Sequence, residues 1–230
     1  MTGTKRSLEA DGVEVAASSK QTKMDYTDLI RILVGAEESR FVVHKDAICG
    51  KSPFFNAACG REWREGQEKC VRLPEQDAGA FRVYLRWVYG DTLEMSQMPE
   101  PDGMADPPSF LNLNKVWMLS RYLQDDDLCN RINDCAIRKI QLRNSGLISK
   151  STLQHCFEHN STESAIGRLF LDALAASSNA AWFALDGQGL PSAVLFDMAR
   201  KFAGGEQKRL PTMKDRCNYH IHPEGQARCS

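Results

Sequence analysis

The spacing of the apolar residues changes along this chain, and this change limits the possible folds more than any other feature. Three short apolar runs are residues 28–35 (DLIRILVG), 40–44 (RFVVH) and 69–74 (KCVRLP), and in the first and the third the apolar side chains recur at alternate positions. Alternation of this kind predicts β-strands. In the first run Ile30, Ile32 and Val34 would share the buried face, and the turn residues after it predict a hairpin with the second run.

Elsewhere the apolar residues recur every three or four positions, which predicts amphipathic helices. The predicted helices lie within residues 52–60, 77–90, 113–123, 126–140, 166–174 and 191–202. Asp77 is the expected N-cap of the second of these helices, and Gly90 is its expected stop. In the last helix Val194, Leu195 and Met198 would point inward.

Composition and charge narrow the possible functions. The 230 residues are 42% hydrophobic and 26% charged, which is typical of a globular protein, and 29 basic and 30 acidic side chains give a net charge of −1. This balance gives no electrostatic reason to expect a nucleic acid or an anionic membrane as a partner. No apolar stretch approaches the roughly 18 residues of a membrane helix, and the first residues lack the apolar core of a signal peptide. We therefore expect a cytoplasmic or nuclear protein whose eight cysteines stay reduced.

Two segments show no apolar period. Residues 1–24 are polar and are predicted to form a disordered tail. Residues 96–110 hold four prolines and are predicted to form an exposed loop.

A histidine and two cysteines lie close together in the sequence. His44, Cys49 and Cys59 could form a catalytic or metal-binding set, because a nucleophilic thiol needs a base within hydrogen-bond reach. Alternatively, the thiols fill space in a packed core and the imidazole bonds to the backbone at a strand-to-helix corner. The apolar neighbours of both cysteines favour this second interpretation.

The order of motifs in this part of the chain is similar to that of a known domain family. FVVHKDAI, the SPFF helix, VRLPE and YLRWVYGDTLE together resemble the BTB/POZ domain, and most closely its fungal-type members. The resemblance covers residues 27–140 and implies an α+β fold, in which a short mixed sheet caps a cluster of helices. An all-helical extension at 149–204 and a tail at 205–230 that contains cysteine and histidine would follow.

The resemblance implies a non-enzymatic protein–protein interaction module. Members of the family self-associate as homodimers, and many dock onto a cullin scaffold as ubiquitin-ligase adaptors. Asp28, His44 and Lys45 match the positions of a charged pocket near the dimer interface of related domains. The alternative for Asp28 and Lys45 is a solvated pair with no role in assembly.

A second motif of the family bears on cullin binding. A hydrophobic residue followed by any residue and a glutamate helps the family contact the scaffold. Here the matching residues are Thr92, Leu93 and Glu94, so threonine stands in the hydrophobic position. The predicted cullin-facing residues are Leu93 and Glu94.

The tail and one helical segment offer possible metal ligands. Cys217, His220, His222 and Cys229 have the spacing C-x2-H-x-H-x6-C, so four soft ligands within thirteen residues could reach one structural zinc ion. The alternative is a disordered chain end that binds nothing. We expect no other cofactor.

The stretch HCFEH, residues 155–159, matches the H-x-x-E-H pattern of one class of zinc peptidase. Two histidines four residues apart share a helix face and could hold a metal ion. A zinc-dependent hydrolase is therefore the alternative function, although no glutamate in residues 163–204 is placed to serve as a third ligand.

Overall fold

A computed structural model describes residues 25–60, 68–96, 98–99, 108–143, 148–178, 189–205, 209–222 and 229. The predicted disordered tail, residues 1–24, lies outside these described residues, as does most of the predicted loop at 96–110. Among the described residues, no helix has the length and the apolar content needed to cross a membrane.

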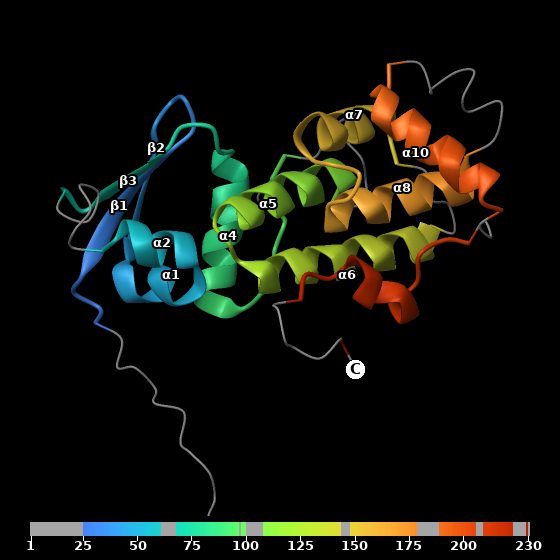
Figure 1. Cartoon of the computed structure of the whole chain (residues 1–230). Coiled ribbons are helices and arrows are strands. Elements are labelled where there is room, and N and C mark those ends of the chain that lie inside the picture. The colour runs from blue at the N-terminus through green and yellow to red at the C-terminus, as the bar shows by residue number, and fades with distance from the viewer. Residues whose placement is uncertain are drawn as a thin grey trace, which may run out of the picture.

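A small mixed sheet lies at one end of the molecule (Figure 1). Its strands are β1 (Leu29–Val34), β2 (Ser39–His44) and β3 (Cys70–Leu73), in the order β2-β1-β3. β1 and β2 form the predicted antiparallel hairpin, while β3 runs parallel to β1. The three predicted core residues of β1 are buried, because alternate side chains of a strand share one face.

The helices pack behind the sheet and extend away from it (Figure 1). They are α1 (Lys45–Lys51), α2 (Pro53–Ala58), α4 (Ala78–Gly90), α5 (Phe110–Tyr122), α6 (Asp126–Arg143), α7 (Lys150–His159), α8 (Ala165–Ser177), α10 (Ser192–Ala203) and the 3-10 helix η2 (Met213–Tyr219). The predicted α+β fold with a helical C-terminal region is confirmed.

The ends of α4 follow the sequence closely. The Asp77 side chain accepts a hydrogen bond from the Ala80 amide at 2.8 Å, as expected of an N-cap. The helix ends at Gly90, but the left-handed backbone conformation belongs to the next residue, Asp91, at φ 51°. The Asp91 amide donates to the Trp87 carbonyl and so closes the last turn.

One continuous apolar core joins the sheet to the helical extension. Phe55 and Phe81 fill it beside the sheet. On α6 the apolar residues that recur every four positions are fully buried, and they are Leu128, Ile132, Ala136 and Ile140. The α8 side chains predicted from helical spacing are buried as well. Helix α6 contacts α5, α8 and η2, and α7 contacts α5 and α8, so α5 and α6 together connect the first part of the chain to the helices that follow.

Two predictions of burial are wrong. Leu195 was expected to point inward, yet 38% of it is exposed, whereas Val194 and Met198 are each 1% exposed. Residues 194 and 198 stack on one line of the helix, and Leu195 is turned about 100° away from that line. Met98 lies in the segment predicted to be an exposed loop, but it is buried at 5%. Its apolar side chain joins the core.

Candidate functional site

His44, Cys49 and Cys59 do not form a pair of nucleophile and base. The Tyr89 hydroxyl accepts a hydrogen bond from the His44 amide and lies 3.0 Å from the His44 Nδ1 atom. The Cys49 thiol donates to the Phe55 carbonyl at 3.5 Å. Its hydrogen bond with Cys59, followed by burial, raises the pKa of Cys49, which keeps this thiol protonated. These contacts favour the interpretation that the two thiols fill space in the core.

Exposed aromatic and apolar side chains gather around His44. Tyr26 is 69% exposed and Tyr89 is 51% exposed, and their rings contact the imidazole edge-on at centroid distances of 5.6 and 5.8 Å. Leu29 is 42% exposed and lies opposite His44 in the β1–β2 register. We call Tyr26, Leu29, His44 and Tyr89 the first-strand surface.

Charges of both signs border the first-strand surface. The carboxylate of Asp28 forms an ion pair with Lys69 at 2.7 Å rather than with Lys45. Lys45 contacts Asp28 through the backbone, where its amide donates to the Asp28 carbonyl at 2.9 Å. The carboxylate of Asp46 accepts a hydrogen bond from the Asp25 amide at 2.8 Å. The Asp28 carboxylate is thus paired with Lys69, and a dimer pocket of Asp28, His44 and Lys45 stays a prediction.

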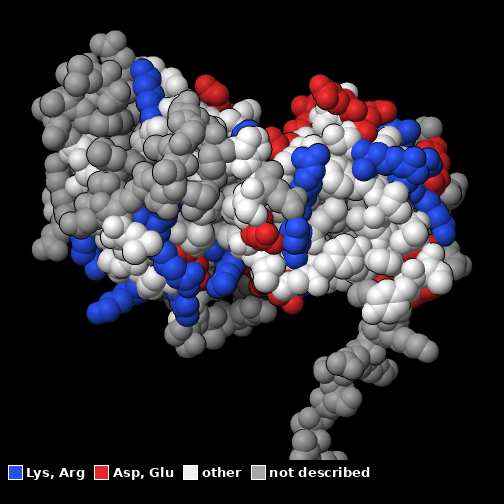
Figure 2. Space-filling model, turned by 180° about the vertical axis from the view of Figure 1, so that it is seen from behind, with Lys and Arg blue, Asp and Glu red and all other residues white. Residues whose placement is uncertain are grey.

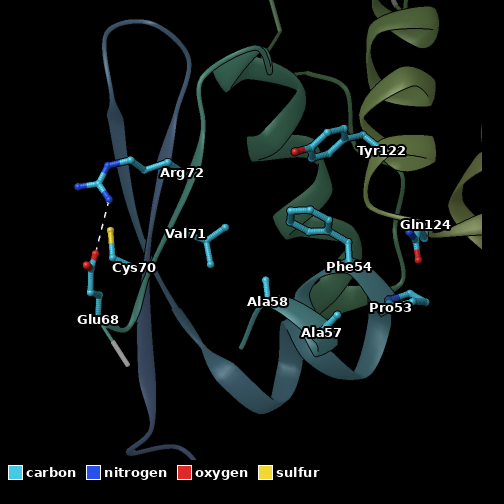
Figure 3. A pocket seen from close by; sticks show the side chains of 10 residues that line it. All are labelled: Pro53, Phe54, Ala57, Ala58, Glu68, Cys70, Val71, Arg72, Tyr122 and Gln124. Atoms are coloured by element: carbon cyan, nitrogen blue, oxygen red, sulfur yellow. Dashed lines mark ion pairs between the residues drawn. The ribbon is translucent and has the colours of Figure 1, made fainter. Parts of the chain in front are cut away.

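A second apolar feature is an open cleft of about 530 Å³ between α2, β3 and the end of α5. Figure 3 shows its lining side chains. Phe54 and Tyr122 form one wall, with ring centroids 5.0 Å apart. An ion pair of Glu68 and Arg72, at 3.8 Å, lies at its edge. This cleft could not be predicted from the sequence. The spacing of a helix shows which side chains are apolar, but it does not show which of them no other element covers.

The predicted cullin-facing residues lie just after α4. The Leu93 side chain is partly buried and packs against the core. The Glu94 carboxylate forms an ion pair with Arg86 at 3.1 Å and accepts a hydrogen bond from the Ser96 hydroxyl at 3.0 Å. Glu94 is therefore on the surface, but it already has partners within the chain.

The four predicted ligands of the tail lie together. The ligand atoms of Cys217, His222 and Cys229 all lie within 4.8 Å of one another. The His222 Nε2 atom is 3.3 Å from the Cys217 sulfur and 3.6 Å from the Cys229 sulfur. The His220 Nδ1 atom is 3.0 Å from the Cys229 sulfur. We call Cys217, His220, His222 and Cys229 the tail cluster, and its ligand atoms could hold a borderline-soft metal ion.

Helix α6 supplies the polar surroundings of the tail cluster. The His220 Nε2 atom lies 2.8 Å from a carboxylate oxygen of Asp134, and both side chains are about nine-tenths buried. The Cys229 amide donates to the Cys217 sulfur at 3.1 Å. Burial, followed by the hydrogen bond with Cys217, raises the pKa of the Cys229 thiol, as expected where two thiolates would repel each other.

Further hydrogen bonds attach the tail to the rest of the molecule. The Asn130 side chain accepts from the Ile221 amide at 2.7 Å and donates to the Ile221 carbonyl at 2.9 Å. The Asn133 amide donates to the Tyr219 carbonyl at 2.5 Å, and the Tyr219 hydroxyl donates to Asp172 of α8 at 2.8 Å. The described part of the tail is thus fixed against α6 and α8.

The stretch at 155–159 lacks the surroundings of a catalytic metal site. The rings of His155 and His159 are 5.1 Å apart, but the His155 Nδ1 atom is 2.9 Å from the Asn114 side-chain amide. Burial, followed by the nearby charge of His159, lowers the pKa of His155. Among the described residues, the potential metal ligands that cluster in a group of three are Cys217, His222 and Cys229 of the tail. His155 and His159 belong to no such group. The hydrolase hypothesis is not supported.

Comparison with protein families matches the N-terminal part of the chain to a known domain. Residues 18–127 match the family model of the BTB/POZ domain. The match begins before β1 and ends at the start of α6, so it contains the sheet, the first-strand surface and the cleft. The narrower fungal-type resemblance stays a prediction. No curated protein matches the chain. Residues 18–127 are therefore similar to the BTB/POZ domain, a protein–protein interaction module, and helices packed on α5 and α6 follow this segment.

Proposed function

We propose that this chain is a self-associating interaction module, and that two copies meet through the first-strand surface. One observation carries the proposal: two exposed tyrosines and an exposed leucine lie together around His44 at one edge of the BTB/POZ domain. Aromatic side chains of this kind are enriched at protein interfaces, because they bury a large area at a small cost in side-chain entropy.

The charges beside this surface suit a second copy of the same chain. A two-fold interface presents one patch to itself, so the patch must be self-complementary. The surroundings carry carboxylates (Asp28, Asp46) and ammonium groups (Lys45, Lys69). A patch of one sign would repel its own copy, whereas a mixed patch can pair acidic groups with basic groups across the axis. The wider surface also carries both signs, as Figure 2 shows for the face opposite Figure 1.

We propose a binding role for this region, not a catalytic one. The Tyr89 hydroxyl accepts a hydrogen bond from the backbone amide of His44. The hydroxyl proton of Tyr89 is then available for a hydrogen bond to the His44 Nδ1 atom. The imidazole is therefore held in place as part of the surface. We expect this module to work in the cytoplasm or nucleus, where its cysteines stay reduced.

Oligomeric state tests the proposal. Sedimentation of the full chain at micromolar concentrations should show a dimer, and Leu29→Arg should convert it to a monomer, because a buried guanidinium without a partner opposes association. Leu142→Arg is the matched control, since Leu142 is an 87% exposed leucine on α6, away from the sheet. Circular dichroism should show that both variants are folded. A strictly monomeric wild-type chain would refute self-association, and a monomer produced only by Leu142→Arg would refute this surface.

Cullin docking is the narrower role that the resemblance suggests. It would use Leu93 and Glu94, and binding would have to compete with the ion pair between Glu94 and Arg86. A pull-down with the intact chain as bait, probed with a purified cullin, tests this role. Glu94→Lys should abolish capture, while the exposed control Glu75→Lys should not. A wild-type bait that captures no cullin would remove the adaptor role and leave self-association standing.

A further inference from the structure

We propose that the tail cluster binds one zinc ion, and that this ion fastens the C-terminal tail to helix α6. The site would be structural, with Cys217, His220, His222 and Cys229 as its four ligands and Asp134 as the residue that positions His220. It lies outside the matched BTB/POZ domain and does not depend on self-association.

The distances fit tetrahedral coordination. With zinc–sulfur bonds of about 2.3 Å and zinc–nitrogen bonds of about 2.0 Å, neighbouring sulfur and nitrogen ligands lie about 3.5 Å apart. The sulfur–nitrogen distances of the cluster are 3.0, 3.3 and 3.6 Å. The ligand atoms of Cys217, His222 and Cys229 thus already surround a space of the size that a zinc ion occupies, and His220 adjoins it at the Cys229 sulfur.

The surroundings of His220 favour metal binding at one nitrogen. Asp134 lies 2.8 Å from Nε2, and a carboxylate can only accept a hydrogen bond from this atom. The proton of a neutral imidazole therefore sits on Nε2, and the lone pair of Nδ1 faces the Cys229 sulfur. A carboxylate behind a ligating histidine is the usual second layer of a zinc site, because it fixes the tautomer and the ring orientation.

The two cysteine ligands also favour zinc. The Cys229 amide donates to the Cys217 sulfur, and such a bond stabilises the negative charge of a thiolate ligand. A set of two thiolates and two imidazoles in tetrahedral geometry is typical of zinc. Because all four positions are taken by the protein, no position remains for a water or a substrate.

The position of the cluster defines its role. Two ligands follow η2 directly, Cys217 lies within η2, and Cys229 comes from beyond residues 223–228. Figure 1 shows η2 lying alongside α6. An ion at the cluster would therefore join Cys229 to η2 and hold both next to Asp134 of α6.

Metal content tests the proposal directly. The untagged full chain, purified under reducing conditions, should contain one zinc per molecule by mass spectrometry of the metal. His222→Ala and Cys217→Ser should each lose it. The matched controls are His159→Ala, an exposed histidine on α7, and Cys49→Ser, a half-buried cysteine of the N-terminal domain, and both should keep it.

Cobalt gives a measurement that does not depend on variants. Titration of the metal-free, reduced wild-type chain with Co²⁺ should produce the intense visible bands of tetrahedral cobalt and the sulfur-to-cobalt charge-transfer band. Failure to bind either metal would overturn the proposal. A disulfide between Cys217 and Cys229 in freshly purified zinc-free protein would also overturn it. The same holds if His159→Ala loses the zinc ion while His222→Ala keeps it.

The role of Asp134 has its own test. Competition with a chelator should show zinc affinity reduced about 10–100-fold in Asp134→Ala, with the stoichiometry unchanged at saturating zinc. Glu158→Ala, which removes an exposed carboxylate on α7, is the control and should bind as wild type. Equal affinity in the two variants would refute the positioning role.

Discussion

The N-terminal domain and the C-terminal tail differ in how much of their packing is apolar and how much is polar. In the domain, the sheet and its helices bury large apolar side chains such as Phe55 and Phe81 completely. The tail packs Tyr219 into the apolar core and Leu210, Met213 and Ile221 against it, and it also makes many hydrogen bonds to α6 and α8, several of them through Asn130, Asn133 and Asp172. Apolar packing is non-directional and spread over many contacts, whereas each hydrogen bond needs one particular partner.

This difference leads to different expectations for stability. A fold held by a shared core unfolds as one unit, so damage to the core lowers the stability of the whole molecule. A segment held by a few polar contacts can detach alone. Substitutions in the two regions should therefore be distinguishable by whether their effects are global or local.

The largest effect is expected from Phe81→Ala. Phe81 is fully buried, and its ring contacts the rings of Phe41, Phe55 and Tyr84. The cavity left behind should lower the free energy of unfolding by about 3–5 kcal/mol, measured by urea denaturation. Phe196→Ala removes the same side chain from a site that is 68% exposed, and should change stability by less than about 0.5 kcal/mol. Equal effects would contradict the assignment of the core.

An intermediate and local effect is expected from Asn130→Ala. This substitution removes both hydrogen bonds to Ile221 and leaves backbone groups without partners, at a cost of about 1–3 kcal/mol. Because the loss is confined to the tail, trypsin should cut faster at Arg209, Lys214 and Arg216, while urea unfolding of the domain should hardly change. Arg131→Ala, at the exposed next position of α6, is the control. An unchanged cutting rate in Asn130→Ala would show that other contacts hold the tail.

The smallest effect is expected at the ion pair of Glu94 and Arg86. Both side chains are nearly half exposed, so water and salt screen their attraction. A double-mutant cycle of Glu94→Ala and Arg86→Ala should give a coupling energy of about 0–1 kcal/mol. A coupling well above this range would mean that the pair anchors the segment after α4, and would weaken the argument that a partner could displace it.

The elements with regular apolar spacing could be predicted from the sequence. The buried faces of β1 and α8 follow directly from periods of two and of three to four residues, and the Asp77 cap follows from its place before a helix. Leu195 and Met98 could not be predicted in the same way. Their burial depends on which neighbouring element covers them, and local spacing does not contain that information.

The candidate sites show the same limit. The sequence spacing named all four residues of the tail cluster, because they lie within thirteen positions of one another. It could not name Asp134 or Asn130, which lie 86 and 91 positions before their partners. Likewise, Lys69 pairs with Asp28 from a position 41 residues away, and local spacing does not predict such a contact.

Hydrogen exchange with and without a strong chelator tests the difference between the two regions most directly. Amides of η2 and residues 220–222 should lose protection when the chelator is present, because the proposed zinc ion and the polar contacts hold them together. Amides of β1 and α4 should exchange at the same rate in both conditions, since the apolar core holds them. An unchanged tail, or an equal loss of protection in β1, α4 and η2, would contradict the account.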